Sequence, residues 1–171
     1  KNVSDNVIEL YMESGSINTT RQVLLTSAVD GDWHHYAFSI FNESSQTKVD
    51  VFKDGQFVST KGIFLSATPK EISDITAVSS GMEMVVGGDF AGTVARNLSG
   101  SMDEFRFWKT RRTPEQIYNS WFVQVGGGTN KNDANLDLGL YYKFNEGITG
   151  DASIDGIALD YSGRINNGTI I

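Results

Sequence analysis

Two adjacent carboxylates, Asp103 and Glu104, interrupt the apolar stretch "GSMDEFRFW" at residues 100–108. Successive side chains of a strand point to opposite faces, so Asp103 would share a face with Phe105 and Phe107, and Glu104 would lie on the other. Whichever face is buried therefore carries an acid. A buried carboxylate is costly unless it meets a cation, hydrogen-bond donors or water, so the pattern indicates a site for one of these.

A third carboxylate, Glu146, ends a similar apolar row near the end of the chain. With the period of a strand, its face also carries Leu140, Tyr142 and Phe144. If the two strand ends meet, one structural Ca²⁺ would satisfy both Asp103 and Glu146, because calcium accepts carboxylate and backbone carbonyl oxygens in irregular geometry. For Asp103 the competing interpretation is a set of hydrogen bonds from backbone N–H groups at a strand end.

The residue pattern does not indicate catalysis. Glycoside hydrolysis needs two carboxyl groups roughly 5–10 Å apart across the sugar, whereas Asp103 and Glu104 would point to opposite faces. His34 and His35 are also adjacent and cannot converge on one metal ion from a strand, so one is expected in the core and one on the surface. Trp33, which begins the same strand, is expected in the core. The sequence has no Gly-x-Ser-x-Gly motif, phosphate-binding glycine loop or zinc-ligand spacing, and we expect no enzyme.

Composition narrows the class of protein further. The 171 residues suit one domain, and 39% hydrophobic residues suffice for a core. A formal net charge of −7 without a basic stripe argues against nucleic-acid binding, and the lack of cysteine excludes disulfides. No apolar run approaches the ~20 residues that cross a bilayer, so membrane insertion is not expected. The chain begins with Lys rather than Met, which we interpret as a sign that it belongs to a longer protein.

Short alternating runs between turn residues predict seven or more strands, at residues 7–12, 21–28, 33–41, 48–60, 82–88, 101–108 and 138–145. Asp54-Gly55 predicts a hairpin, because both residues tolerate the positive φ of a type I′ turn. One short helix is predicted to begin at Pro114, with Thr113 as its cap and Gln116 completing a capping box. This pattern favours an antiparallel sandwich or jelly roll.

Four motifs then occur in a familiar order: "GDWHHYAFSI", "VFKDGQFV", "VVGG" and "GSMDEFRFWKTRRTPEQI". Over about residues 30–121 the chain resembles laminin-G-like and pentraxin-like domains of the concanavalin A-like lectin/glucanase superfamily. The resemblance implies an all-β fold, an antiparallel jelly-roll sandwich with one short helix. It also implies a structural calcium at the Asp of an Asp-x-apolar-Arg-apolar strand, which here is Asp103. The Glu-x-Asp-x-x-Glu pattern of laminarinase-type relatives is missing.

The domain organisation expected from these observations has three parts. Residues 1–124 form a laminin-G-like sandwich without its original first strand, and residues 125–137 form a Gly/Asn-rich linker. Residues 138–171 either supply a tail strand that completes the sandwich or open a next module. We favour the first for residues 138–145, because a free strand would expose its apolar row. The linker with the "YYKFNEG" tail also resembles large virion proteins of tailed phages.

The expected function is that of a non-catalytic, lectin-like binding or adhesion module in a larger extracellular or virion structural protein. The alternative is a purely structural assembly or decoration module with no glycan ligand. Its partner would be a glycan or a neighbouring virion or extracellular protein, and the chain would act within a larger protein or a homo-oligomer. The ligand-binding residues are expected in the loop at residues 87–100, which combines aromatic and polar groups: Asp89, Phe90, Arg96 and Asn97. The competing interpretation is an ordinary connecting loop.

Overall fold

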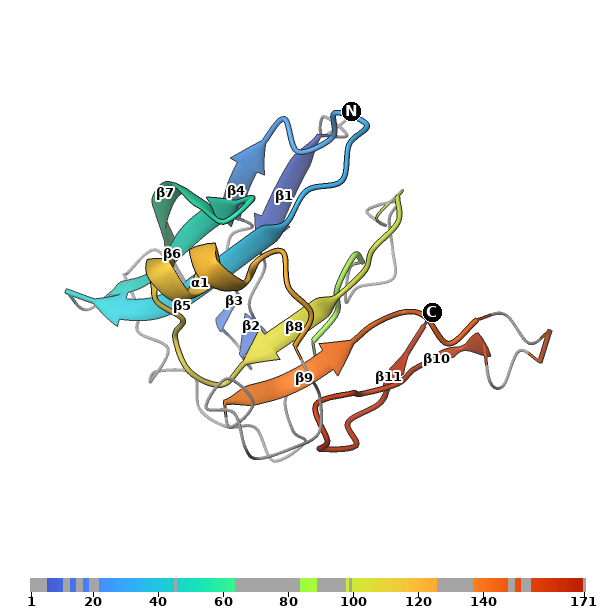
Figure 1. The fold of residues 1–171 in the computed structure, drawn as a ribbon. Helices are drawn as coiled ribbons and strands as arrows, with labels where there is room; N and C mark the ends of the chain where they lie inside the picture. The colour runs from blue at the N-terminus through green and yellow to red at the C-terminus, as the bar shows by residue number, and fades with distance from the viewer. Residues whose placement is uncertain are drawn as a thin grey trace. The chain divides into compact units, whose positions relative to one another are not determined.

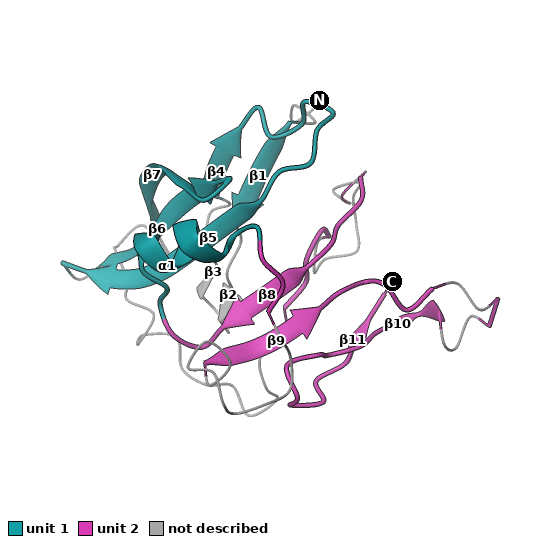
Figure 2. Ribbon diagram, viewed as in Figure 1, with its two compact units in different colours: residues 1–83, 111–122 teal, residues 84–110, 123–171 magenta. Residues whose placement is uncertain are grey.

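A computed structural model shows short antiparallel strands and one short helix (Figure 1). It describes residues 6–10, 13–14, 17–18, 22–44, 46–63, 84–88, 98, 100–125, 137–147, 150–151 and 155–170. The chain divides into two compact units (Figure 2). The first consists of residues 1–83 and 111–122, and the second of residues 84–110 and 123–171. Antiparallel sheets with one short helix are the fold class that the sequence predicts.

The first unit is centred on a three-stranded antiparallel sheet of β5 (Tyr36–Glu43), β6 (Gln46–Lys53) and β7 (Gln56–Ile63). The turn between β6 and β7 is Asp54-Gly55, with φ values of 51° and 76°, which confirms the predicted hairpin. The β5–β6 register pairs Tyr36 with Lys53. That register places the loop before β5 beside the Asp54-Gly55 turn, and this is the end of the sheet where the candidate site lies.

A second pair, β1 (Val7–Leu10) and β4 (Gln22–Thr26), supplies the other side of this unit's core. Leu24 of β4 is buried with Val49, Val51 and Ile63 of the three-stranded sheet. Side chains alternate between the two faces of β6, so Val49 and Val51 point to the same face as this core. Along the chain, the segment from β1 to β4 contains a small hairpin of β2 (Glu13–Ser14) and β3 (Ile17–Asn18), which the sequence did not predict.

The opposite face of β6 is covered by residues 111–122 of the same unit. Arg111 pairs with the buried Asp50, with 2.8 Å between its guanidinium nitrogen and Oδ2. Helix α1 (Pro114–Ser120) follows and buries Ile117. The helix begins where the sequence predicts, because the Thr113 hydroxyl accepts the N–H of Gln116 and the Gln116 side chain accepts the N–H of Thr113. Residues 111–122 therefore cover this face of the three-stranded sheet.

The second unit contains β8 (Phe105–Trp108) paired with β9 (Leu138–Tyr142), and a small hairpin of β10 (Ile157–Ala158) and β11 (Gly168–Thr169). Phe105 pairs with Tyr142, so the first residue of β8 lies beside the last residue of β9. An isolated bridge from Tyr142 to Asp160 connects β9 to the segment that follows it. β9 therefore pairs with β8, as the apolar row at residues 138–145 predicts.

The apolar row of Leu140, Tyr142 and Phe144 is not the fully buried face that the sequence predicts. Leu138 and Tyr141 are fully buried, whereas Phe107 is 37% exposed and Leu140, Tyr142 and Phe144 are only half-buried. The ladder shifts register between Phe107 and Trp108, which pair with Leu140 and Leu138, so Gly139 is an extra residue and one strand period does not run through β9. Positive φ values of 56° at Glu104 and 51° at Phe144 also end the period before it reaches Asp103 and Glu146. Residues 84–88, the described part of the predicted strand at 82–88, form bends rather than a strand.

Candidate functional site

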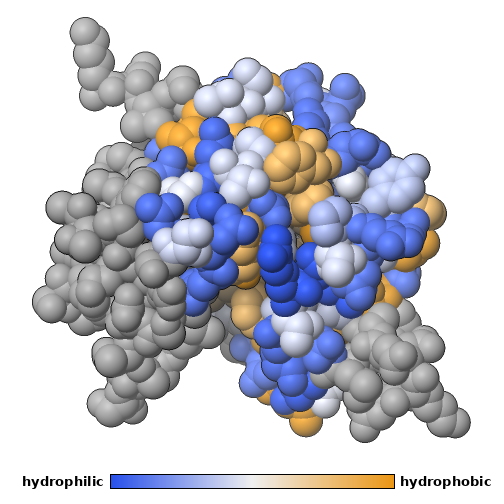
Figure 3. Space-filling view, turned by 90° about the vertical axis from the view of Figure 1, so that its left-hand side faces the viewer, coloured by the Kyte–Doolittle hydropathy of each residue, from blue (hydrophilic) through white to orange (hydrophobic). Residues whose placement is uncertain are grey.

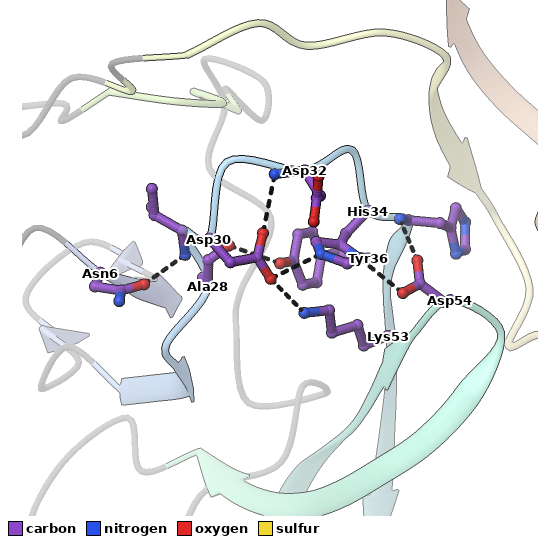
Figure 4. Close-up of polar contacts among 10 residues, drawn as sticks. Asn6, Ala28, Asp30, Asp32, His34, Tyr36, Lys53 and Asp54 are labelled. Carbon is purple, nitrogen blue, oxygen red and sulfur yellow. Dashed lines mark hydrogen bonds and ion pairs between the residues drawn. The ribbon is translucent and has the colours of Figure 1, made fainter.

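A cluster of polar contacts in the first unit is centred on the imidazole of His34, in the loop that enters β5 (Figure 4). Its Nδ1 lies 2.8 Å from Oδ2 of Asp54, in the turn between β6 and β7. Its Nε2 lies 2.8 Å from Oδ2 of Asp30, at the start of the same loop. The His34 side chain is 18% exposed. One ring therefore connects a loop to a hairpin turn through two carboxylates.

The same carboxylates also hold backbone N–H groups of the loop. Oδ1 of Asp30 accepts the N–H of Asp32 at 3.1 Å, and Oδ1 of Asp54 accepts the N–H of His35 at 2.9 Å. The start of the loop is fixed by the Tyr36 hydroxyl, which donates to the carbonyl of Ala28 at 2.8 Å. These bonds hold the backbone before and after the two intervening residues, Trp33 and His34 (Figure 4 labels Asp30, Asp32 and Asp54).

Charge is nearly balanced around the ring. The Lys53 ammonium lies 3.2 Å from the same Asp30 oxygen that faces His34. The N–H of Asp32, together with Lys53 and His34, lowers the pKa of Asp30 to about 2. Burial would raise the pKa of Asp54, but the N–H of His35 and the His34 ring outweigh it and lower that pKa. The hydrogen bond to Asp54 raises the pKa of His34 above its ordinary value.

Trp33 is 70% exposed, so its predicted place in the core is wrong. The backbone becomes a strand only at Tyr36, and the residues before it form a loop. His35, rather than Trp33, packs against an aromatic side chain, with 6.1 Å between the centroids of the His35 and Trp121 rings. Sequence reasoning treated the histidines as strand residues and so missed the His34 cluster. The signals for it were the i, i+4 spacing of Asp30 and His34 and the position of Asp54 in the turn.

The candidate calcium ligands lie in the second unit, just outside its paired strands. Asp103 is exposed, and its Oδ1 accepts the N–H of Glu104 at 2.8 Å. Glu146 is half-buried, and its Oε1 accepts the N–H of Leu159 at 3.2 Å. Because the first residue of β8 pairs with the last of β9, the two carboxylates leave the ladder at the same end. Their backbone hydrogen bonds are the arrangement that the competing interpretation of Asp103 proposes.

The fit to calcium is partial. Within the described part of the chain, no three His, Cys, Asp or Glu side chains are grouped so that they could hold a metal ion. The described hydrogen bonds use one oxygen of Asp103 and one of Glu146, which leaves the second oxygen of each available to a cation. Calcium takes 6–8 oxygen ligands. Two carboxylates would have to be completed by backbone carbonyls and water.

Glu104, rather than Asp103, is the carboxylate on the buried side of the β8–β9 pair. One of its oxygens lies 2.8 Å from a guanidinium nitrogen of Arg106 and accepts the hydroxyl of Tyr141, and the other accepts an N–H of Gln124. Burial would raise the pKa of Glu104, but the hydrogen bonds from Arg106 and Tyr141 lower it. Of the two adjacent acids, Glu104 is therefore the one on the buried side, and its charge is paired with Arg106 and the hydroxyl of Tyr141.

The expected ligand-binding residues Asp89, Phe90, Arg96 and Asn97 lie outside the described residues. On the face drawn in Figure 3, hydrophilic residues predominate and apolar residues form separate groups rather than one continuous patch. In the described part of the chain, no helix has the length and apolar character needed to cross a bilayer.

Comparison with known proteins identifies one relationship. A laminin G-like family model, described as the concanavalin A-like lectin/glucanases superfamily, matches residues 2–118. The matched range is more than half of the chain and contains the Asp30–His34–Asp54 cluster, Trp33, Asp103 and the first residues of the helix. No curated protein and no solved structure matches the chain significantly.

Proposed function

The chain belongs to the concanavalin A-like lectin/glucanases superfamily, and from this premise we propose that it is a non-catalytic, lectin-like module of a larger extracellular or virion protein. Laminin G-like domains typically bind other molecules. The proposal adds a ligand class, glycan, and a place for it, the loop at residues 30–35. The residues that the sequence singled out at 87–100 are proposed to contribute to ligand binding from their own loop.

The observation that carries the proposal is the 70% exposed indole of Trp33 in a loop whose backbone is hydrogen-bonded on both sides. Phe122 and Phe57 of the same unit are also exposed, and Trp33 differs from them in having exposed carboxylates in its own loop and a hydrogen-bonded backbone on both sides. A fixed aromatic ring offers contact area at low entropic cost to a ligand that stacks on it. The exposed carboxylates Asp30 and Asp32, which precede Trp33 in the same loop, offer acceptors for hydroxyl groups. An aromatic ring in a loop that also carries acceptors matches the chemistry of a sugar.

The proposed module includes a structural Ca²⁺ at the strand end that carries Asp103 and Glu146. Support comes from the β8–β9 register, which brings both stretches to one end of the ladder, and from the two carboxylate oxygens left over by the described hydrogen bonds. The ion would supply positive charge at the end of the ladder from which both acid-bearing segments leave. Its role would be to stabilise the second unit.

A glycan array probed with the labelled chain, with and without chelator, tests the proposal. The expected result is binding to a defined group of glycans, reduced by at least tenfold in Trp33→Ala. Steady release of reducing sugar from a bound polysaccharide would overturn the non-catalytic assignment. The absence of binding to any glycan, with or without calcium, would replace glycan recognition with the alternative, a structural assembly or decoration module.

A further inference from the structure

The contacts of the His34 ring favour the form in which both ring nitrogens carry a proton. Both ring nitrogens lie 2.8 Å from a carboxylate oxygen, Nδ1 from Asp54 and Nε2 from Asp30. A neutral imidazole has one N–H donor and one acceptor, so only one of these contacts could then be a hydrogen bond. The other would set a nitrogen lone pair against a carboxylate oxygen. Both contacts are favourable only in the imidazolium form.

The charged and titratable groups around the ring favour that form. Asp30 faces it from the loop, Asp54 and Lys53 from the β6–β7 hairpin, and Tyr36 from β5, with 6.2 Å between the ring centroids. The two carboxylates carry two negative charges and Lys53 one positive charge. An imidazolium at His34 balances this group, whereas a neutral ring leaves an uncompensated negative charge.

The backbone links the state of this ring to Trp33. The N–H of Asp32 and the N–H of His35, which lie before and after Trp33 and His34 in the loop, are held by the two carboxylates that His34 joins. After deprotonation Lys53 would still hold Asp30, through the Asp30 oxygen that His34 shares, and the backbone bonds between His35 and Asp54 would remain. Loss of the His34 proton therefore loosens the connection between loop and turn without abolishing it.

We propose that protonated His34 is a clamp that fixes the loop at residues 30–35 to the β6–β7 turn, and that loss of its proton loosens Trp33. His34 is thus a positioning residue for Trp33. The consequence for glycan binding rests on the proposed function, whereas the clamp itself does not. A ligand that needs the fixed loop would bind best in mildly acidic solution. If about one third of molecules keep the fixed loop at high pH, the apparent Kd rises about threefold.

Two nuclear magnetic resonance titrations of the whole chain, from about pH 5 to about pH 9, test the clamp without any ligand. The first follows the imidazole of His34, assigned by its loss in His34→Gln. We expect both ring nitrogens to be protonated at low pH, with a midpoint above about 6.5 that falls in Asp30→Asn. A midpoint at or below about 6.5, or no change in Asp30→Asn, would overturn the clamp.

The second titration follows Trp33 in the chain labelled with fluorotryptophan, assigned by Trp33→Phe. Its resonance should shift or broaden with the midpoint of His34 and stay constant in His34→Gln, while the Trp108 resonance serves as an internal reference. A Trp33 signal that ignores His34 would contradict the positioning role. Binding of an array-identified glycan at both ends of the titration separates the two proposals. A moving Trp33 signal with no glycan bound defeats the proposed function alone, and pH-independent glycan binding through Trp33 defeats the link to the clamp.

Discussion

The hydroxyl of Tyr141 donates a hydrogen bond to the carboxylate of Glu104, and this bond joins β9 to the residue that precedes β8. Tyr141 is fully buried, and the same Glu104 oxygen pairs with Arg106. Burial and the bond to Glu104 raise the pKa of Tyr141 to about 12, so the phenol stays a donor through the working pH range. The bond therefore ties together two segments that lie far apart in the sequence.

Replacing Tyr141 with Phe should lower the free energy of unfolding by about 1–2 kcal/mol, because Glu104 loses a charge-assisted hydrogen bond and keeps its pair with Arg106. Urea denaturation measures this loss. Tyr118→Phe is the matched control, since Tyr118 is 54% exposed and should tolerate the change. Equal effects of the two changes would show that the Tyr141 bond does not stabilise the fold.

Glycine at position 55 is required twice, by its φ of 76° and by the ring of Trp121, into which an added Cβ would project. Gly31 has a φ of 93° but open space around its Cα, so Gly31→Ala measures the backbone strain alone, about 1–2 kcal/mol. Gly55→Ala should cost about 1–3 kcal/mol more, because Trp121 must move. If the two variants were equally stable by thermal or urea denaturation, Trp121 would not be packed on the turn.

The stabilising effect of His34 should depend on pH with a definite sign. Its folded pKa is raised, so its contribution is complete below about 6.5 and is lost as pH rises through the higher folded value. Asp30 and Asp54 have lowered pKa values, so their contribution is present above about 3.9 and is lost as pH falls, for Asp30 through about 2.

The difference in unfolding free energy between the native chain and His34→Gln should therefore be greatest between about pH 4 and about pH 6.5, and should shrink toward pH 9. Urea denaturation at a series of pH values measures it. A difference that grew with rising pH would mean that His34 is held in its neutral form, and would contradict the geometry of its two carboxylate contacts.

Calcium should stabilise the chain if it binds at Asp103 and Glu146. An ion that binds only the folded state, at 100 times its Kd, adds about 2.7 kcal/mol, so chelation should lower the melting temperature. Asp103→Asn should remove the difference between calcium and chelator, whereas Asp32→Asn, which changes an exposed carboxylate of the first unit, should preserve it. If calcium does not change the melting temperature of the unaltered chain, the calcium site is contradicted, and the role of Asp103 and Glu146 is to accept their backbone hydrogen bonds.

Sequence reasoning succeeded where structure is determined by neighbouring residues. The Asp54-Gly55 turn and the Thr113 capping box depend on the φ preferences and hydrogen bonds of three or four consecutive residues, and both are present. The fold class followed from strand periods and from the order of motifs, and the family match over residues 2–118 bears it out.

Sequence reasoning failed where one residue departs from its ordinary backbone conformation or where distant residues meet. A positive φ at Glu104 exchanges the roles expected of the two adjacent acids, and no residue type at that position signals it. The contact between His34 and Asp54 depends on the β5–β6 register. That register could have been inferred by counting back from a tight turn after Glu43, but treating Trp33 as the start of a strand hid the loop that contains His34.

Isothermal titration calorimetry of an array-identified glycan with three chains shows whether Trp33 forms part of a glycan site. We predict that Trp33→Ala weakens binding by at least tenfold, about 1.4 kcal/mol, because the stacking surface is lost. Phe57→Ala, which removes another exposed aromatic ring of the first unit, 55% exposed, should leave the affinity unchanged. Equal binding by Trp33→Ala and the unaltered chain, with Trp33→Ala fully folded, would contradict glycan recognition at the loop of residues 30–35.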